Sequence, residues 1–242
     1  MSVLSNKIAV ITGASSGVGT AIALGLAREG AKLCLIGRKL EALNSIAERA
    51  RTTSSEVSAH QVDLTNGEEI RALVGTLTKN VGSVDLLVHS AGAIALGSIE
   101  DASVNDLDQQ YLTNVRGPYV LTQGLLPMLI ESRGQIVFIN SSAGVAAKAN
   151  AAQYSATKHA LKGFADALRD EVNEHGVRVL SIFLGRTATP MQAAVHRVEG
   201  KTYQPERLIQ PEDVASVVIN SLALPRTAEV TDVSIRPLTK PS

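Results

Sequence analysis

The amino-acid sequence predicts a doubly wound α/β fold, a parallel sheet of about seven strands with helices on both faces. Two observations support this prediction. Short runs rich in β-branched and apolar residues recur along the chain, and longer segments with helical periodicity lie between them. That alternation is typical of units in which a helix connects two parallel strands.

The apolar runs give the expected strands in chain order. They are "KIAVIT" (7–12), "KLCLIG" (32–37), "EVSAHQV" (56–62), "VDLLVHS" (84–90), "GQIVFIN" (134–140), "GVRVLSIFL" (176–184) and a last strand near 230–235. The periodic segments predict helices near 17–30, 39–51, 66–80, 104–131, 152–175 and 211–223.

Residues 185–210 are the least regular part of the sequence, and they follow the carboxyl end of a predicted strand. Because ligands of open α/β sheets bind at such ends, this segment is expected to form a substrate lid. The chain contains no repeat, low-complexity tract or linker. We therefore expect residues 1–242 to form a single domain.

Composition is ordinary for a globular protein, with 45% hydrophobic and 19% charged residues among 242. Basic and acidic residues number 23 each, so charge predicts neither nucleic acid nor a membrane surface as a partner. No apolar run approaches the ~18 residues that span a bilayer, and no secretion signal is recognisable, so a cytoplasmic location is expected. The one cysteine, Cys34, is expected to be buried in a strand, which excludes an intramolecular disulfide.

A glycine-rich turn follows the first predicted strand and precedes the first helix. Gly13, Gly17 and Gly19 stand in "TGASSGVG". Glycines let a pyrophosphate approach the backbone, and a helix N-terminus offers unpaired N–H groups and a partial positive charge. The alternative is a glycine-rich turn without a ligand, but the strand before it and the helix after it favour a dinucleotide site.

Several further motifs occur in one order along nearly the whole chain. They are Thr12 to Gly19 with the spacing Thr-Gly-x-x-x-Gly-x-Gly, Asp63, "HSAG" at 89–92, Asn114, Ser141, Tyr154 and Lys158. Together they resemble the short-chain dehydrogenase/reductase family. The C-terminal segment 211–238 is similar to the branch that contains 3-hydroxy acid dehydrogenases.

The resemblance implies one Rossmann-type catalytic domain, an oxidoreductase of small carbonyl or alcohol substrates without a metal, and a homotetramer or homodimer. It implies a catalytic set of Asn114, Ser141, Tyr154 and Lys158. Ser141 rather than Ser142 takes the serine position, because it lies thirteen residues before Tyr154 and three before Gly144. The implied cofactor contacts are Thr12, Gly13, Ser15, Ser16, Gly17, Val18, Gly19, Arg38, Asp63, Leu64, Ser90, Ala91, Gly92, Tyr154, Lys158, Gly185, Thr187 and Thr189.

The end of the second predicted strand indicates which cofactor is bound. An NAD site usually has an acidic residue there, about 20 residues beyond the glycines, that accepts hydrogen bonds from the ribose. Here Gly37 takes that position, and Arg38 follows with a guanidinium suited to a 2′-phosphate. NADP(H) is therefore expected, and the alternative is that Arg38 and Lys39 only begin a solvated helix face. By resemblance, Asp63 is expected near the adenine ring.

Tyr154 and Lys158 stand four residues apart on one face of a predicted helix, a spacing that alone would be an ordinary surface pattern. Together with the other motifs, the pair is interpreted as a proton donor, Tyr154, and a cation, Lys158, that changes the pKa of the donor. Lowering the pKa of a tyrosine by about three units needs about 4 kcal/mol, and a lysine about 5 Å away supplies about 3 kcal/mol at an effective dielectric of about 20. We therefore expect Lys158 to lower the pKa of Tyr154 and, by resemblance, to bind the nicotinamide ribose. Ser141 is expected to hydrogen-bond the substrate oxygen.

Pro118 lies four residues after Asn114, inside one long predicted helix. It has no N–H to donate to the Asn114 carbonyl, and its ring displaces that carbonyl. In the family an asparagine here holds a water that extends a proton path from the lysine. We therefore expect a kinked helix with the Asn114 carbonyl directed toward Lys158; the alternative is a kink that only shapes helix packing.

Two positions depart from the family pattern. His89-Ser90 stands where Asn-Asn is common, and Leu184 precedes Gly185 where proline is common. His89 is expected to be a core or hydrogen-bonding residue rather than a base, whereas Leu184 could alter the nicotinamide pocket. Thr189 still fits the family's threonine near the nicotinamide carboxamide.

Cations in the predicted lid leave the substrate's charge open. Arg186, His196, Arg197 and Lys201 could attract an acidic substrate, although a solvated basic face is the simpler interpretation. The competing class of protein is a non-catalytic NADP(H)-binding, redox-linked regulator. The presence of the serine, tyrosine and lysine together favours an enzyme.

Overall fold

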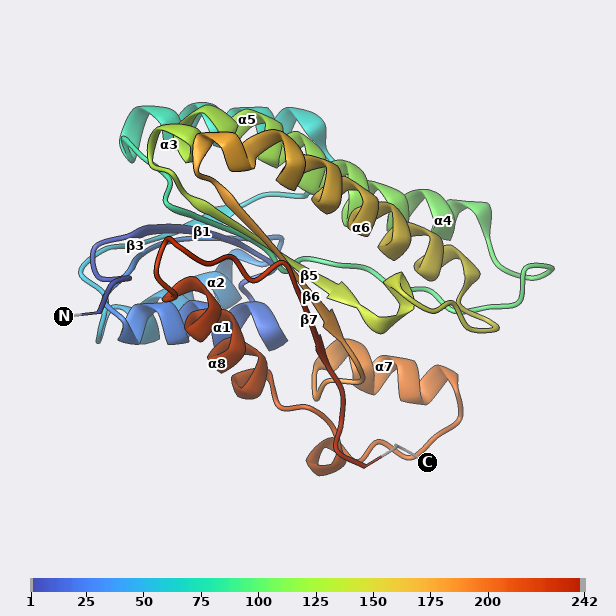
Figure 1. Cartoon of the computed structure of the whole chain (residues 1–242). Helices are drawn as coiled ribbons and strands as arrows, with labels where there is room; N and C mark the ends of the chain where they lie inside the picture. Colours follow the sequence, from blue (N-terminus) through green and yellow to red (C-terminus); the bar gives the residue numbers. More distant parts are fainter. Residues whose placement is uncertain (1, 240–242) are drawn as a thin grey trace.

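Seven parallel strands form one sheet in the computed structural model, which describes residues 2–239. In chain order they are β1 (Ile8–Thr12), β2 (Lys32–Gly37), β3 (Val57–Gln61), β4 (Leu86–His89), β5 (Gln135–Ser141), β6 (Arg178–Leu184) and β7 (Asp232–Ile235). Their spatial order is β3-β2-β1-β4-β5-β6-β7, and every neighbouring pair is parallel. The chain therefore runs outward from β1 to β3, crosses back to β4, and continues to the opposite edge (Figure 1). The predicted doubly wound sheet is confirmed.

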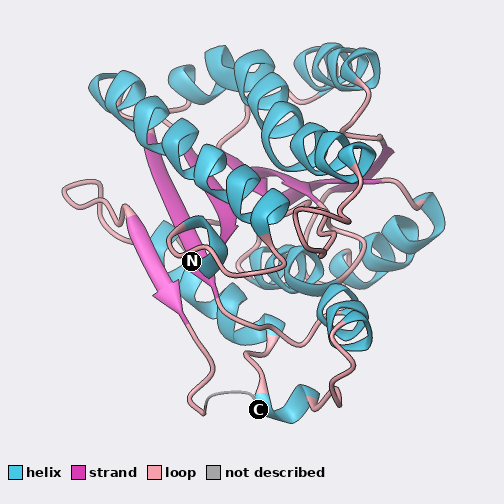
Figure 2. Cartoon of the chain, turned by 90° about the vertical axis from the view of Figure 1, so that its right-hand side faces the viewer, coloured by secondary structure: helices cyan, strands magenta, loops and turns pink. Residues whose placement is uncertain are grey.

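Helices cover both faces of this sheet (Figures 1 and 2). One face packs against α1 (Gly17–Arg28), α2 (Leu40–Ala50) and α8 (Pro211–Leu222). The other packs against α3 (Gly67–Asn80), α5 (Gly117–Glu131) and α6 (Ala152–Val172). Two shorter helices, α4 (Val104–Tyr111) and α7 (Pro190–Val198), lie toward the carboxyl ends of the strands.

Alternating side chains of the strands supply the two cores. In β1, Ala9 and Ile11 face the core under α1, whereas Val10 faces the core under α3 and α5. Strand side chains alternate between the faces of a sheet, and a parallel sheet covered on both faces buries both sets. Cys34 of β2 is 4% exposed, as expected for a strand cysteine.

The segment predicted as one helix over 104–131 is divided. A π-helical stretch, Leu112–Arg116, separates α4 from α5, and the Gly117 N–H donates to the carbonyl of Leu112, five residues earlier. Pro118 then falls in the first turn of α5, where a missing N–H is tolerated. The helix thus accommodates the proline by a change of hydrogen-bond register between α4 and α5.

Residues 185–210 contain more regular structure than the sequence suggested. Thr189 caps α7, because its hydroxyl accepts from the Gln192 N–H at 3.2 Å, and Pro190 occupies the first helical turn. Thr187 forms an isolated parallel bridge with Ile209, which closes the segment into a loop beside the sheet. Among residues 2–239, no helix has both the length and the apolar character needed to cross a bilayer.

Candidate active site

A cleft of about 720 Å³ lies at the carboxyl ends of the strands. Its walls include residues that follow β1, β2, β4, β5 and β6, together with side chains of α6 and of residues 185–199. The cleft is therefore at the point where the strand order reverses between β1 and β4. Open α/β sheets bind their ligands at that point.

Most of the predicted site residues line this one cleft. They are Gly13, Ser15, Ser16, Gly17, Val18, Arg38, Asp63, Leu64, Ser90, Ala91, Gly92, Ser141, Tyr154, Lys158, Gly185, Thr187 and Thr189. The remaining three, Thr12, Gly19 and Asn114, are buried and lie outside the lining.

The turn after β1 requires its glycines. Gly13 has a φ of 66°, and a Cβ there would lie 2.7 Å from the Ala91 nitrogen. Gly17 has a φ of 55°, and a Cβ on Gly19 would lie 2.3 Å from the Gly13 carbonyl oxygen. A larger residue at Gly13 or at Gly19 would therefore displace the neighbouring backbone. The turn is held against the loop after β4 by Thr12, whose hydroxyl accepts from the N–H groups of Ser90 (3.1 Å) and Ala91 (3.2 Å).

The N-terminus of α1 is compatible with an anion. Ser16 precedes the helix in an extended conformation and makes no side-chain cap, and the first turn contains no acidic residue. The first N–H groups of the helix therefore keep their partial positive charge toward the cleft.

Cations lie at the end of β2, where the sequence analysis expected a 2′-phosphate. Gly37, Arg38 and Lys39 all line the cleft. A Cβ on Gly37 would be 3.4 Å from the Ser15 hydroxyl, so the glycine leaves room beside the glycine-rich turn. Asp63 lies on the same part of the wall, and its Oδ1 accepts from the Thr65 N–H and hydroxyl at 2.9 and 2.8 Å.

Ser141, Tyr154 and Lys158 line the same cleft and lie close together. Ser141 is the last residue of β5, and the tyrosine and lysine lie in α6. Lys158 is 4% exposed, and its Nζ donates to the Ile139 carbonyl at 3.2 Å and lies 5.8 Å from the centre of the Tyr154 ring. The expected grouping of a hydroxyl, a phenol and an ammonium is therefore present.

Burial dominates the protonation of this group. It raises the pKa of Tyr154, and contact with the Ser141 hydroxyl, which favours the phenolate, opposes the rise only in part. Burial also lowers the pKa of Lys158 to about 8. The expected lowering of the Tyr154 pKa is therefore not found, because the removal of the phenol from water outweighs the contact that favours the phenolate.

Asn114 supports the loop after β4 from behind the cleft. Its Oδ1 accepts from the Ala93 N–H at 2.8 Å, and its Nδ2 donates to the Ala93 carbonyl at 2.8 Å and to the Thr157 hydroxyl at 3.0 Å. A Cβ on Gly92 would lie 3.5 Å from Asn114 Oδ1 and 3.9 Å from Lys158 Nζ, so both side chains approach the same point. The direction of the Asn114 main-chain carbonyl stays a prediction.

His89 and Leu184, the two departures from the family pattern, are buried. His89 Nε2 lies 2.8 Å from the Thr122 hydroxyl, and its ring stacks on Phe138 with centroids 4.9 Å apart. Burial lowers the pKa of His89 to about 3, so it is a neutral core residue, as expected. Leu184 lines the cleft and pairs with Ser141 of β5 and Ile235 of β7.

An ion pair joins the start of the predicted lid to the residue that follows α7. Arg186 Nη2 donates to both carboxylate oxygens of Glu199 at 2.7 Å, and Arg186 Nη1 lies 3.2 Å from His196 Nε2. Although burial alone would raise the pKa of Glu199, Arg186 and Lys201 hold it below its usual range. Arg186 is thus paired within the lid, which argues against its serving as a free cation for an acidic substrate.

Sequence reasoning missed part of the cleft wall. Lys39 could have been found from its place beside Arg38, but the other residues come from loops and helix faces without a recognisable motif. The missed residues include Ile94, Leu96, Gln109 and Lys148, whereas Met191, Gln192 and Glu199 belong to the predicted lid. In residues 2–239, no group of three or more histidine, cysteine, aspartate or glutamate side chains is placed to hold a metal ion.

Comparison with known proteins identifies the family. Residues 7–200 match the model of the short chain dehydrogenase family. An "uncharacterized oxidoreductase" of Staphylococcus aureus (strain USA300) is 34% identical over 239 residues, which cover 98% of this chain and 100% of that protein. The chain therefore belongs to the short chain dehydrogenase family of oxidoreductases. This identifies the family and not the 3-hydroxy acid dehydrogenase branch, which stays a prediction.

Solved structures show the same fold over almost the whole chain. An alcohol dehydrogenase from the archaeon Thermococcus sibiricus, complexed with 5-hydroxy-NADP, has a TM-score of 0.89 and 27% identity, covering 98% of this chain and 99% of that one. L-sorbose reductase from Gluconobacter frateurii, complexed with NADPH and L-sorbose, has a TM-score of 0.85 and 27% identity, covering 96% and 95%.

Proposed function

We propose that this protein is an NADP(H)-dependent oxidoreductase that interconverts a carbonyl compound and the corresponding alcohol. The observation that carries the proposal is the convergence of Ser141, Tyr154 and Lys158 on one cleft with the glycine-rich turn. A binding protein would need the turn but not these three groups.

The residues of the cleft fit a dinucleotide with a 2′-phosphate. The glycines at 13, 17 and 19 have no room for a Cβ, and the α1 N-terminus faces the cleft without an acidic residue. Arg38 and Lys39 are suited to the additional phosphate. Similar structures in complex with 5-hydroxy-NADP and with NADPH support the same choice.

The chemistry supplied by bound NADP(H) is hydride transfer to or from the substrate carbon. For reduction, Tyr154 donates its phenolic proton to the substrate oxygen, which it can do at neutral pH because a phenol is protonated there. Ser141 hydrogen-bonds the same oxygen and holds it near the phenol.

Lys158 stabilises the phenolate that remains after proton transfer. Because its pKa is about 8, Lys158 is protonated in most molecules at neutral pH. Its buried position makes this charge more effective than it would be in water. We include the binding of the nicotinamide ribose by Lys158 in the proposal, together with a proton relay through Asn114 and a substrate lid at 185–210. The proposal also includes a cytoplasmic location for the protein.

The test is the oxidation of NADPH by the purified protein with a panel of ketones and aldehydes, and the reverse reaction with alcohols. Tyr154→Phe should lower kcat by about 10²-fold or more, because a positioned proton donor contributes that much. NADPH affinity should stay close to that of the wild type, since only the hydroxyl is removed. A variant with wild-type turnover would remove Tyr154 from the mechanism. Tight NADPH binding without turnover on any substrate would instead favour a non-catalytic regulator.

A further inference from the structure

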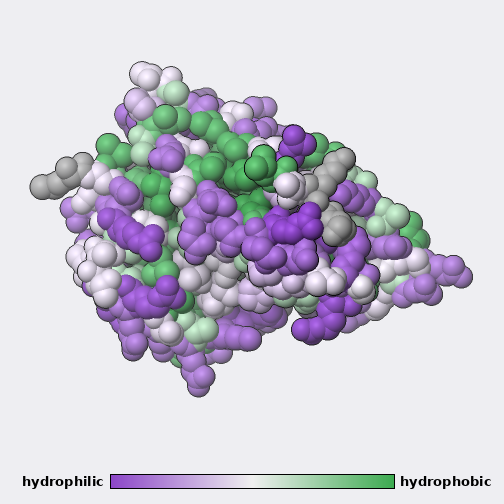
Figure 3. Space-filling model, turned by 90° about the horizontal axis from the view of Figure 1, so that it is seen from below, coloured by the Kyte–Doolittle hydropathy of each residue, from purple (hydrophilic) through white to green (hydrophobic). Residues whose placement is uncertain are grey.

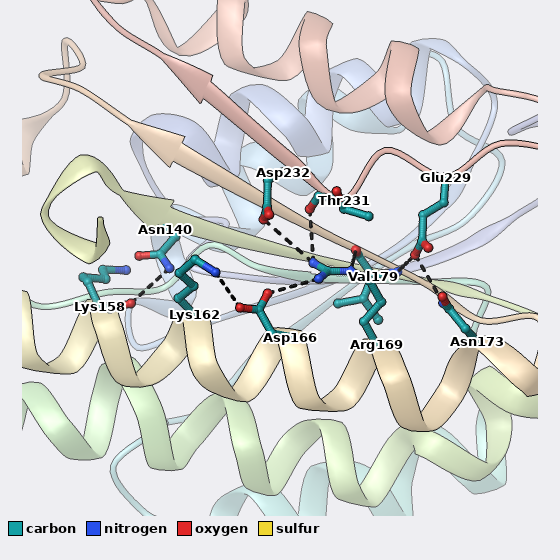
Figure 4. Close-up of polar contacts among 10 residues, drawn as sticks. All are labelled: Asn140, Lys158, Lys162, Asp166, Arg169, Asn173, Val179, Glu229, Thr231 and Asp232. Carbon is teal, nitrogen blue, oxygen red and sulfur yellow. Dashed lines mark hydrogen bonds and ion pairs between the residues drawn. The ribbon is translucent and has the colours of Figure 1, made fainter. Parts of the chain in front are cut away.

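A buried amide joins the strand that carries the serine to the helix that carries the tyrosine and lysine. Asn140, directly before Ser141 in β5, is 3% exposed. Its Nδ2 donates to the main-chain carbonyl of Lys158 at 3.1 Å (Figure 4). Its Oδ1 accepts from the Ser141 N–H at 2.7 Å. One side chain therefore contacts the backbones of two proposed catalytic residues.

The surroundings keep this amide in place. A Cβ on Gly144 would lie 2.8 Å from Asn140 Oδ1 and 2.8 Å from the Lys158 carbonyl oxygen, so a glycine there leaves the space that the amide needs. Lys158 also reaches back to β5 through its Nζ, which donates to the Ile139 carbonyl. The lysine is thus attached to consecutive residues of β5 through both its main chain and its side chain.

The rest of α6 is held by other contacts. Farther along the helix, Asp166 pairs with Lys162 and Arg169, and the Nε of Arg169 donates to the Val179 carbonyl of β6 at 3.0 Å (Figure 4). The helix therefore does not depend on Asn140 to remain packed on the sheet. What Asn140 adds is local: it fixes the turn of α6 at Lys158 relative to Ser141.

We infer that Asn140 is a positioning residue that sets the geometry between Ser141 and the Tyr154–Lys158 pair, an inference that rests on the proposed function. Proton transfer depends steeply on the distance between the groups, and a displacement of about 1 Å can cost about 100-fold in rate. Removing the amide should therefore affect turnover more than cofactor binding.

The test compares Asn140→Leu with a matched control, Gln135→Leu. Gln135 is a buried amide at the other end of β5, 7% exposed, and its Nε2 donates to a helix carbonyl, that of Leu222, at 3.1 Å. Both variants lose a buried amide from one strand. Asn140→Leu should lower kcat by about 10- to 100-fold, with less than about a threefold change in KM for NADPH. Gln135→Leu should keep kcat within about twofold of the wild type while it loses thermal stability.

A double-mutant cycle separates positioning from a general loss of structure. Because Asn140 acts through Ser141, adding Asn140→Leu to Ser141→Ala should cause little further loss of kcat. An equal loss in both backgrounds, or wild-type turnover in Asn140→Leu, would overturn the inference.

Asn140→Asp is the second variant, to be used if Asn140→Leu does not fold. It keeps an oxygen to accept from Ser141 and loses the donor to Lys158, so it should also lower kcat and show the same non-additivity. A wild-type protein without turnover on any substrate would refute the proposed function, and the positioning role with it. An active wild type with additive or unchanged Asn140 variants would refute the positioning role alone.

Discussion

Lys158 is a cation held almost out of water, and this has a consequence for stability. Burial lowers its pKa from the ordinary 10.5 to about 8 in the folded protein. Between these pH values the unfolded chain binds more protons than the folded protein does. The free energy of unfolding contributed by this residue therefore rises as pH increases from about 8 to 10.5.

Denaturant unfolding of the wild type and Lys158→Met over this pH range checks the prediction. The difference in unfolding free energy, wild type minus variant, should grow with pH, because methionine fills a similar volume and has no proton to lose. Other groups that titrate in this range are common to both proteins and cancel in the difference. A difference that stays flat would show that Lys158 keeps an ordinary pKa.

Arg38 governs cofactor preference under the proposed function, because its side chain borders the cleft where an acidic residue would select NADH. Arg38→Asp should shift the ratio of kcat/KM for NADPH over NADH by about 10- to 100-fold toward NADH. A change of this size corresponds to the free energy of one or two charge-assisted hydrogen bonds to the 2′-phosphate. Arg28→Asp, an exposed cation at the other end of α1, is the control and should leave the ratio unchanged. A wild type that already prefers NADH would refute the cofactor choice.

At the scale of elements, the π-helical stretch before α5 gives Pro118 a testable role. Pro118→Ala supplies an N–H four residues after Asn114, which can bond the Asn114 carbonyl and close it to a proton relay. If that carbonyl extends a proton path, kcat should fall by at least about tenfold, with NADPH affinity unchanged. Pro127→Ala changes a proline inside α5, away from the cleft, and should leave kcat unaffected. Equal turnover in the two variants would restrict Pro118 to helix packing.

The elements also show where sequence patterns stop being informative. Continuous apolar runs placed β1, β2 and β5 within one or two residues, because a strand buried on both faces leaves a strong signal. The π-helical stretch was missed because one extra residue in a helix barely changes its periodicity. Helix α7 was missed because its segment is short and begins with a proline.

For the whole molecule, the reversal of strand order explains why motifs distant in the sequence share one site. Glycines after β1, the loop after β4, Ser141 of β5 and the tyrosine and lysine of α6 reach the same cleft only because β1, β4 and β5 are neighbours. Spacing and order of the motifs were enough to predict this grouping. The residues of the cleft that face the substrate could not be predicted, because their positions depend on how α4, α7 and the loops pack.

The surface of the molecule bears on its expected assembly. Seen from the side of α7 and α8, the surface is mostly hydrophilic, with apolar residues gathered in one area (Figure 3). On the opposite side, α4 and α5 expose Val104 (71%), Tyr111 (49%) and Tyr119 (49%). Contiguous exposed apolar patches mark surfaces that associate, and we expect these three side chains to belong to one.

We therefore predict a homodimer or homotetramer, with a mass by light scattering of two or four times the 25.4 kDa of one chain. Tyr111→Glu should shift the mass toward that of one chain, because a charge would have to be buried where an apolar ring packs. The side chain of Val3 is 65% exposed at the N-terminal end of the chain, and Val3→Glu should leave the mass unchanged. A wild type that is monomeric at micromolar concentration would contradict the prediction of an oligomer. An oligomer that Tyr111→Glu leaves intact would instead place the interface away from α4.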